Sequence, residues 1–208
     1  GTLNLRRNRL TDAEKYLEQT VKLRPNYPEA WNNLGMIAGQ EGHNEDAVRN
    51  FKQSLVLRPD FAIATLNLGN LYRRMGNYDE AGRLLNRAFE LEPNDPEVNY
   101  SLGMFYALQD QTNKAADYLE KAVDLRPDYP EALNNLGILF ARDRNYPKAE
   151  EQFKTCIRVA PTFDQSYINL ARLYVSESDR DKARAVLQDL LRVQPEHPAA
   201  RRALEMLQ

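Results

Sequence analysis

Asparagine recurs at a fixed interval along this chain. Asn33, Asn67, Asn135 and Asn169 are separated by 34 residues or by twice that number, and Ser101 occupies the missing place in the series. A side-chain amide both donates and accepts hydrogen bonds, so it can pair with the N–H and C=O groups of an extended peptide without reading its side chains. The row therefore suits binding of a peptide backbone. The alternative is structural, with the same amides joining one helix to the next by hydrogen bonds.

Further polar side chains follow the same interval close to this row. Three asparagines and a tyrosine add amide and hydroxyl groups: Asn32, Asn70, Asn134 and Tyr100. Four arginines add positive charge: Arg73, Arg74, Arg142 and Arg172. These arginines are either a solvated surface or sites for an anionic group of a ligand. Because glutamates accompany them (Glu29, Glu97 and Glu131), the mixed charge predicts no ligand of a single sign.

Residues capable of catalysis or metal binding are scarce. The chain has one cysteine, Cys156, and two histidines, His43 and His197, which are 154 residues apart. Cys156 takes a place that alanine fills in other parts of the chain, which predicts a small buried packing residue. The glycines do not form the pattern of a phosphate-binding loop. We therefore expect a protein that is not an enzyme by itself and has no metal site and no cofactor.

Composition excludes further classes of protein. The 208 residues carry a formal charge of −2 and the pI is near 5.8, whereas nucleic-acid-binding proteins usually have a basic excess. Mean hydropathy is −0.67, and no stretch approaches the roughly 18 apolar residues of a membrane-spanning helix. We therefore expect no contact with nucleic acid or membrane. One cysteine cannot form an internal disulfide. The first residues lack the apolar core of a signal peptide, which leaves the compartment open, with the cytoplasm favoured.

A period of 34 residues organises the whole chain. Six prolines mark it without a slip: Pro25, Pro59, Pro93, Pro127, Pro161 and Pro195. Small residues follow the same period in two series: Ala13, Ala47, Ala81, Ala115, Ala149 and Ala183, and Gly35, Gly69, Gly103, Gly137 and Ala171. Self-similarity at this spacing predicts stacked supersecondary units.

Each period predicts a helix, a turn and a second helix. In residues 130–163, Pro130 suits the first turn of a helix, and a second helix is expected from about Pro147 to just before Pro161. The turn position holds glycine in two repeats and a different residue in three: Gly42, Gly76, Asp110, Arg144 and Ser178. Glycine there is thus helpful rather than required. Small residues at the eighth and twentieth positions of a repeat predict a close crossing of its two helices.

The register of the repeats sets the boundaries. Five full repeats are expected at residues 28–61, 62–95, 96–129, 130–163 and 164–197, preceded by the second half of a repeat at 1–27 and followed by a capping helix at 198–208. Gly1 would fall in the middle of a first helix, which predicts a parent protein that continues on the N-terminal side. The cap is expected to cover the preceding helix with its apolar side: Ala199, Ala203, Leu204 and Leu207.

These residues resemble the tetratricopeptide repeat (TPR) family. The repeat at 28–61 matches the family pattern with Trp31, Leu34, Gly35, Ala47, Phe51 and Pro59, and the repeat at 62–95 with Leu68, Gly69, Tyr72, Ala81, Leu85, Ala88 and Pro93. The resemblance implies an all-α fold, a right-handed solenoid of stacked helix-turn-helix repeats whose first helices line a concave groove. It also implies that positions 2, 5, 6, 9, 12 and 13 of each repeat face that groove. The polar residues described above, from Asn32 to Arg172, fall at these positions.

The asparagine row is similar to the ladder in the repeat arm of the O-linked N-acetylglucosamine transferases. That ladder holds the main chain of the substrate polypeptide, and Ser101 breaks the match. Chaperone-binding members of the TPR family instead hold a carboxylate with a clamp that needs lysine at positions 2 and 5. Neither position carries lysine in this chain, so we expect no such clamp.

Three functions are compatible with these features. The first is a protein–protein interaction scaffold that binds an extended peptide or partner segment in the concave groove. The second is the substrate-recognition arm of a larger, glycosyltransferase-like enzyme whose catalytic domain is not in this chain. The third is a homo-oligomeric assembly module, with end-to-end self-association through the open N-terminal half-repeat.

Overall fold

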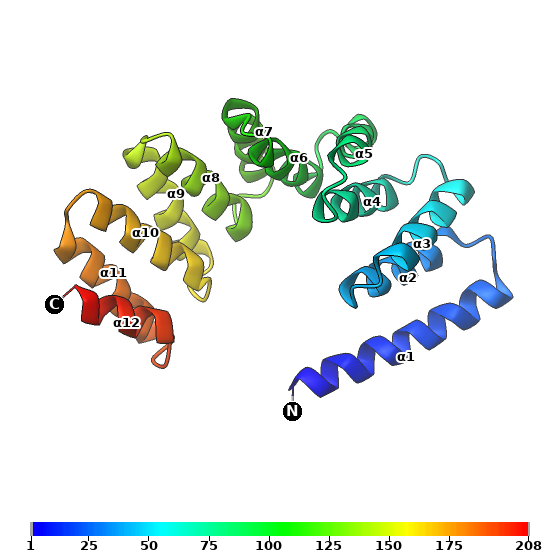
Figure 1. Cartoon of the computed structure of the whole chain (residues 1–208), viewed down its shortest axis with the longest axis horizontal. Coiled ribbons are helices and arrows are strands. Elements are labelled where there is room, and N and C mark those ends of the chain that lie inside the picture. The colour runs from blue at the N-terminus through cyan, green and yellow to red at the C-terminus, as the bar shows by residue number, and fades with distance from the viewer. Residues whose placement is uncertain (1, 208) are drawn as a thin grey trace. The chain divides into compact units, whose positions relative to one another are not determined.

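The computed structural model describes the backbone of residues 2–207 and the side chains of residues 11–207. Throughout these residues, helices alternate with short turns (Figure 1). The helices of this range are α1 (Thr2–Leu23), α2 (Pro28–Gln40), α3 (Asn44–Leu57), α4 (Ala62–Arg74), α5 (Tyr78–Leu91), α6 (Pro96–Leu108), α7 (Thr112–Leu125), α8 (Pro130–Arg142), α9 (Tyr146–Val159), α10 (Asp164–Ser176), α11 (Arg180–Val193) and α12 (Pro198–Met206). Their order follows the 34-residue period.

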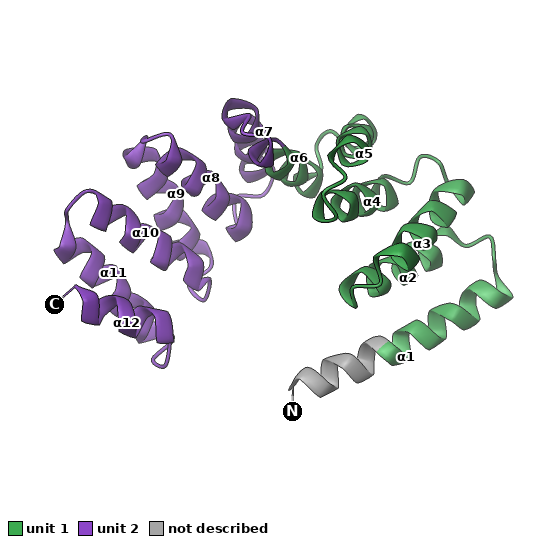
Figure 2. Ribbon diagram, viewed as in Figure 1, with its two compact units in different colours: residues 1–105 green, residues 106–208 purple. Residues whose placement is uncertain are grey.

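The chain divides into two compact units (Figure 2). Unit 1 comprises residues 1–105 and unit 2 comprises residues 106–208, so the boundary falls near the end of α6. In unit 1, α2 packs on α3 and α4 on α5, and α4 also contacts α3 of the preceding repeat. In unit 2, α8 packs on α9, α10 packs on both α9 and α11, and α12 packs on α11. Each of these contacts joins helices that are neighbours in sequence, as in other repeat proteins.

Helix boundaries follow the prolines. Pro130 occupies the first turn of α8, where its missing N–H removes no intrahelical hydrogen bond. The next helix, α9, begins at Tyr146, one residue before the expected Pro147, and ends before Pro161. The expected helix–turn–helix pattern of this repeat is confirmed.

The eighth residue of a repeat faces the twenty-fourth across the helix pair. A Cβ atom added to Gly35 would lie 2.7 Å from the ring of Phe51, and one added to Gly137 would lie 2.6 Å from the ring of Phe153. Real Cβ atoms do not approach so closely, so each phenylalanine ring occupies the space that a side chain on the glycine would need. Glycine at these two positions is therefore required by the ring that it faces.

A smaller partner relaxes this requirement. A Cβ atom on Gly69 would lie 3.1 Å from Leu85. The repeat that has alanine at the eighth position, Ala171, also has leucine at the twenty-fourth, Leu187. The residue opposite thus decides whether glycine or alanine fits. The helical Gly82 obeys the same rule, because an added Cβ would lie 2.8 Å from the ring of Phe105.

The turn between the two helices has a left-handed residue in every full repeat. The φ angle is +84° at Gly42 and +78° at Gly76. It is also positive, between 56° and 64°, where the repeat has another residue: Asp110, Arg144 and Ser178. Glycine is thus helpful rather than required, as the sequence predicts. Each residue with a Cβ nevertheless adopts a conformation that costs about 1–2 kcal/mol.

In three repeats and in the C-terminal cap, the fourth residue ties the first helix to the preceding linker. The indole Nε1 of Trp31 donates to the carbonyl oxygen of Pro25 at 2.8 Å. The same bond to the equivalent proline, six residues earlier, is made by the Asn99 amide, by the Tyr167 hydroxyl and by the Arg201 guanidinium, at 3.0, 3.1 and 2.8 Å. Four chemically different donors therefore perform one structural task.

The N-terminal helix departs from the repeat pattern. The backbone of α1 is one continuous helix, whereas each full repeat divides into two helices over a comparable stretch. The expected place of Gly1 inside a first helix lies outside the described residues.

The C-terminal helix α12 packs on α11, and three of the four residues expected on its covered side are buried or partly buried. Ala200 and Leu207 are buried, and Ala203 and Leu204 between them are partly buried. These residues recur at the three- and four-residue spacing of one helix face. Ala199, expected on the covered side, is exposed because it falls outside that face. Among residues 2–207, no helix is both long and apolar enough to cross a membrane.

We expect Gly137→Ala to destabilise unit 2 by about 1–2 kcal/mol, because overpacking against Phe153 exceeds the roughly 1 kcal/mol that alanine gains in a helix. Urea unfolding followed by circular dichroism measures this change. Gly69→Ala, opposite Leu85, is expected to stay within about 1 kcal/mol of wild type. In a Gly137→Ala/Phe153→Leu variant, the two changes should offset one another. A double variant whose loss equals the sum of the single losses would contradict the steric explanation.

We expect Ser178→Gly to stabilise the protein and Gly42→Ala to destabilise it, each by about 1 kcal/mol, because only glycine adopts positive φ without strain. No atom lies within 4 Å of a Cβ added at Gly42, so its effect reports backbone strain alone. Thermal midpoints give the comparison. Ser178→Ala is the matched control, since it keeps the Cβ and should not stabilise; equal gains from Ser178→Ala and Ser178→Gly would refute the backbone explanation.

Candidate functional site

The residues of the predicted groove lie on the first helices of the repeats. Within unit 1 they come from α2, α4 and α6, and within unit 2 from α8 and α10. In the asparagine row, Asn33 is exposed, and three members are partly buried: Asn67, Asn135 and Asn169. The asparagines one position earlier, Asn32 and Asn134, are only 3% and 5% exposed. Those two amides are therefore part of the helix packing.

Two members of the row join consecutive repeats. Asn67 donates from Nδ2 to Oδ1 of Asn32 at 3.0 Å, and Asn169 donates in the same way to Asn134 at 2.9 Å. In each pair, position 6 of one repeat bonds position 5 of the preceding repeat. The amide donors of Asn67 and Asn169 therefore serve the helix-to-helix role, and their carbonyl oxygens take no part in this bond.

A different bond replaces this pair where asparagine is missing. Position 5 of the second repeat is Leu66, which has no polar group, and position 6 of the third is Ser101. Here Asn70, one turn further along α4, donates from Nδ2 to Oγ of Ser101 at 2.9 Å. The sequence indicates Ser101 only as a gap in the row. Its role depends on a partner at a different repeat position, which the period alone does not identify.

One pocket of unit 1 gathers five of the predicted residues. It has a volume of about 270 Å³ and is walled by the three first helices of this unit. Its lining includes Asn67, Asn70, Arg73, Arg74 and Tyr100. Much of the remaining wall is formed by Met36, Gln40, Glu97 and Ser101. Residues from three successive repeats thus form a single hollow.

The two arginines of this pocket differ in environment. Arg73 is partly buried and Arg74 is exposed. Burial lowers the pKa of the Arg73 guanidinium; Tyr100 and Tyr78 oppose this shift, and the neighbouring charge of Arg74 adds to it. An arginine keeps its proton under such a shift, so the pocket carries a partly desolvated positive charge.

The two predicted arginines of unit 2, Arg142 and Arg172, have different surroundings. Arg142 donates to Oδ1 of Asp110 at 3.3 Å and to Oγ1 of Thr112 at 2.8 Å. It therefore braces the turn before α7. Arg172 is exposed and lines a pocket of about 310 Å³ together with Asn169. It also borders a mainly apolar pocket of about 360 Å³ between α10, α11 and α12.

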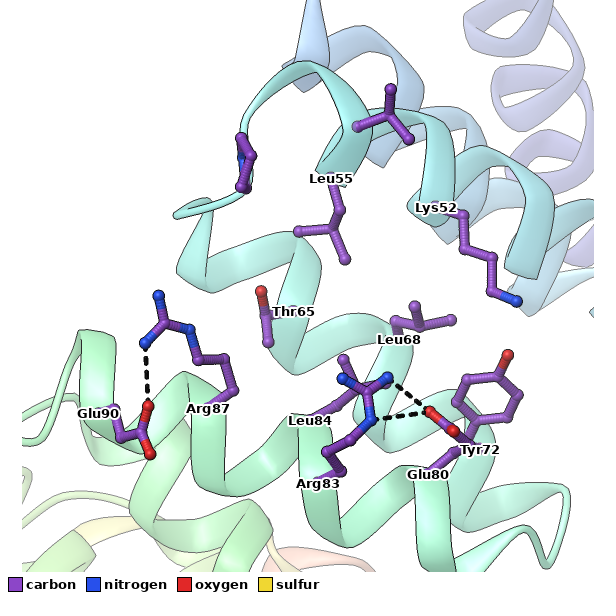
Figure 3. Close-up of a pocket in the computed structure, with 12 residues that line it drawn as sticks. Lys52, Leu55, Thr65, Leu68, Tyr72, Glu80, Arg83, Leu84, Arg87 and Glu90 are labelled. Carbon is purple, nitrogen blue, oxygen red and sulfur yellow. Dashed lines mark hydrogen bonds and ion pairs between the residues drawn. The ribbon is translucent and has the colours of Figure 1, made fainter.

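A larger hollow, which the sequence does not indicate, lies between α3, α4 and α5 (Figure 3). Its volume is about 920 Å³, and Leu55, Thr65 and Leu68 form part of its wall. Its two arginines pair with carboxylates of their own helix: Arg83 with Glu80 at 2.6 Å and Arg87 with Glu90 at 2.9 Å. Both arginines of this hollow are thus already paired within α5.

The equivalent hollow two repeats later has a different chemistry. It measures about 260 Å³ and is lined by Glu120, Lys148 and Glu151 in place of Lys52, Glu80 and Arg83. Because charge signs reverse between equivalent positions and the volumes differ, the two hollows have no common ligand chemistry. The groove side is therefore the stronger candidate site.

The residues that could suggest catalysis have structural roles. Cys156 is fully buried, and its Sγ lies 3.4 Å from the Pro130 carbonyl oxygen. Burial, the largest cause, raises the pKa of this thiol, which confirms the expected packing residue. His197 bonds Asp164 at 2.8 Å and accepts from the Ala200 N–H at the start of α12. Among the residues that the structure describes, no three His, Cys, Asp or Glu side chains gather as metal ligands would.

The repeated helix pairs and the lined groove define a helical repeat protein of the solenoid class. Sequence profiles of the tetratricopeptide repeat match residues 60–128 and 94–162, residues 140–207, residues 1–41 and residues 28–61. The chain belongs to the tetratricopeptide repeat family. The expected all-α fold of TPR repeats is confirmed, and proteins of this family commonly act as protein-binding scaffolds. No curated protein sequence matches the chain significantly.

Solved structures with the same fold include three TPR proteins. A chain of the APC/C hetero-tetramer Cut9-Hcn1 has a TM-score of 0.82 and 18% identity over 96% of this chain and 40% of its own length. PilF of Pseudomonas aeruginosa has a TM-score of 0.80 and 21% identity over 98% of this chain and 92% of its own. YrrB, a TPR protein with an unusual peptide-binding site, has a TM-score of 0.66 and 23% identity over 91% and 97%. This chain thus spans about two fifths of the Cut9-Hcn1 chain.

We expect Asn67→Ala to lower the thermal midpoint, because it leaves the buried Asn32 carbonyl oxygen without its donor at a cost of about 1–3 kcal/mol. Asn113→Ala, at an exposed position of α7, should change the midpoint much less. Circular dichroism of both variants makes the comparison. Equal midpoints would mean that the bond between Asn67 and Asn32 contributes nothing to stability.

Proposed function

We propose that this chain is a protein–protein interaction scaffold that binds an extended segment of a partner across its first helices. The observation that carries the proposal is the pocket of about 270 Å³ in unit 1, which residues of α2, α4 and α6 line together. A segment that lies across three helices meets equivalent positions of three repeats in turn. An extended backbone suits such a surface better than a compact ligand does.

The hydrogen-bonding groups that remain on the groove side support a backbone ligand. Asn67 and Asn169 use their Nδ2 atoms between repeats, so their Oδ1 atoms can accept from peptide N–H groups. Asn33 accepts from Asn32 at 3.3 Å, so its own Nδ2 can donate to a peptide carbonyl. The structural and the ligand-binding alternatives for the row are thus compatible, since each amide has an NH₂ donor and a separate carbonyl acceptor.

The family of this chain and the solved structures with the same fold support protein or peptide binding in general, without naming a partner. Peptide binding is known for YrrB, which shares the fold with this chain. A recognition arm of a larger enzyme would use the same groove as a free scaffold. The partner must therefore be found by experiment on the groove itself.

A peptide library displayed on phage, selected against the intact chain, tests the proposal. We expect selected twelve-residue peptides, measured by calorimetry, to lose about tenfold or more in affinity for an Asn33→Ala/Asn67→Ala variant that melts above the assay temperature, because each lost hydrogen bond weakens binding by about 1 kcal/mol. Asn113→Ala on α7 is the matched control. Unchanged affinity would remove the asparagine row from the site, and failure to select any peptide would overturn the proposed function. Light scattering across concentration would show whether the chain binds itself instead.

A further inference from the structure

The C-terminal end of α4 brings two arginines to the unit 1 pocket. Arg73 and Arg74 are both part of its lining. Arg74 extends toward α2, because a Cβ added to Gly39 would lie 3.5 Å from its Nη2 atom. The one carboxylate in the lining is Glu97, so two positive charges face one negative charge and the pocket is net positive.

Hydrogen-bond donors exceed acceptors around this pocket. Arg73 directs both Nε and Nη2 to a single oxygen, Oδ1 of Asn70, at 3.4 Å each. Asn70 in turn donates to Oγ of Ser101, so the hydroxyl hydrogen of Ser101 remains to donate elsewhere. A guanidinium offers five N–H donors and no acceptor. The pocket therefore presents N–H and O–H groups to whatever occupies it.

Arginines on the second helix α5 have carboxylate partners, whereas Arg73 in this pocket donates to an amide. Arg83 and Arg87 of α5 each pair with a carboxylate three residues away, while the best acceptor of Arg73 is a neutral amide at a long distance. Partial burial of a charge is costly unless an opposite charge compensates it. A carboxylate that enters the pocket would supply this compensation through a bidentate contact with a guanidinium.

A structural explanation competes with this one. Arginine in the last turn of a helix interacts favourably with the helix dipole, and both residues lie in the last turn of α4. That interaction is available to a fully solvated side chain, so it accounts for the presence of the arginines and leaves the burial of Arg73 unexplained. The two explanations differ in their effect on ligand selection.

We propose that this pocket binds the side-chain carboxylate of an aspartate or glutamate in the partner segment. The inference rests on the proposed function. A side chain fits better than a chain terminus, because the arginines lie on the middle one of the three first helices of unit 1. A segment laid across these helices passes the pocket partway along its length. Arg73 and Arg74 thereby determine which segments the groove accepts.

Parallel selections from one phage library test the proposal. Each peptide is fused to the coat protein through its C-terminus, so only side chains present carboxylates. The library is selected against the wild-type chain, against Arg73→Gln/Arg74→Gln, and against Arg49→Gln. Arg49 is the matched control, since it lies on α3, pairs with Asp46 and is absent from the pocket lining. Circular dichroism confirms that all three proteins are folded at the selection temperature.

Wild type and Arg49→Gln should select peptides enriched in aspartate or glutamate at one position, and the double arginine variant should not. A selected peptide with an amidated C-terminus, titrated by calorimetry, should lose about tenfold or more in affinity when its acidic residue becomes the corresponding amide. The same peptide change should have little further effect on the double variant.

Peptides that bind wild type without acidic enrichment, or equal affinities of the acid and amide peptides, would overturn the carboxylate site and leave the groove function standing. An equal loss of binding for acid and amide peptides in the double variant would support the purely structural explanation and overturn the proposal. Failure to select any peptide with wild type would overturn both.

Discussion

Each helix pair depends on the contact between a small residue, glycine or alanine, at the eighth position and a large residue opposite it. At Gly35 and Gly137, a phenylalanine ring fills the volume of the missing Cβ, and close approach at this point lets the rest of each pair interdigitate. Dispersion and burial favour the close crossing over many atoms. The residue opposite then decides whether the eighth position tolerates a Cβ atom, because leucine leaves more room than phenylalanine does. The eighth and twenty-fourth positions of each repeat therefore both shape the helix pair and limit which residues the sequence can have there.

The groove side follows from this packing. Position 8 faces the second helix of its own repeat. Position 5 meets position 6 of the following repeat, so asparagines at these two positions can join consecutive repeats through one end of the amide. The same asparagines therefore belong both to the contact between repeats and to the predicted groove. The bond between Asn67 and Asn32 joins two repeats and also fixes the orientation of the Asn67 amide. In the proposed binding mode, one residue would thus contribute to both binding and stability, whereas the two arginines of α4 would contribute chiefly charge.

The 34-residue period accounts for most of the fold. Prolines, small residues and the turn position predict the helix pairs and their register, because each repeat must meet the same packing at both faces. The site is less predictable. The family resemblance assigns Asn32 to the groove, but its burial depends on the neighbouring repeat, which provides Asn67. The pairing of Asn70 with Ser101, the engagement of Arg142 with Asp110, and the pocket around Arg73 all depend on contacts between different repeat positions. A single period carries no information about such contacts.

The joint between repeats has a further consequence. The linker carbonyl at the recurring proline accepts a hydrogen bond from indole, amide, phenol or guanidinium alike. A joint that needs only one donor of suitable reach does not require its two sides to be fitted to each other. Copies of the repeat could therefore be duplicated, deleted or exchanged during evolution without redesign of the junction. The surface residues of each copy would then be free to diverge, and a chain assembled in this way acquires new ligands one repeat at a time.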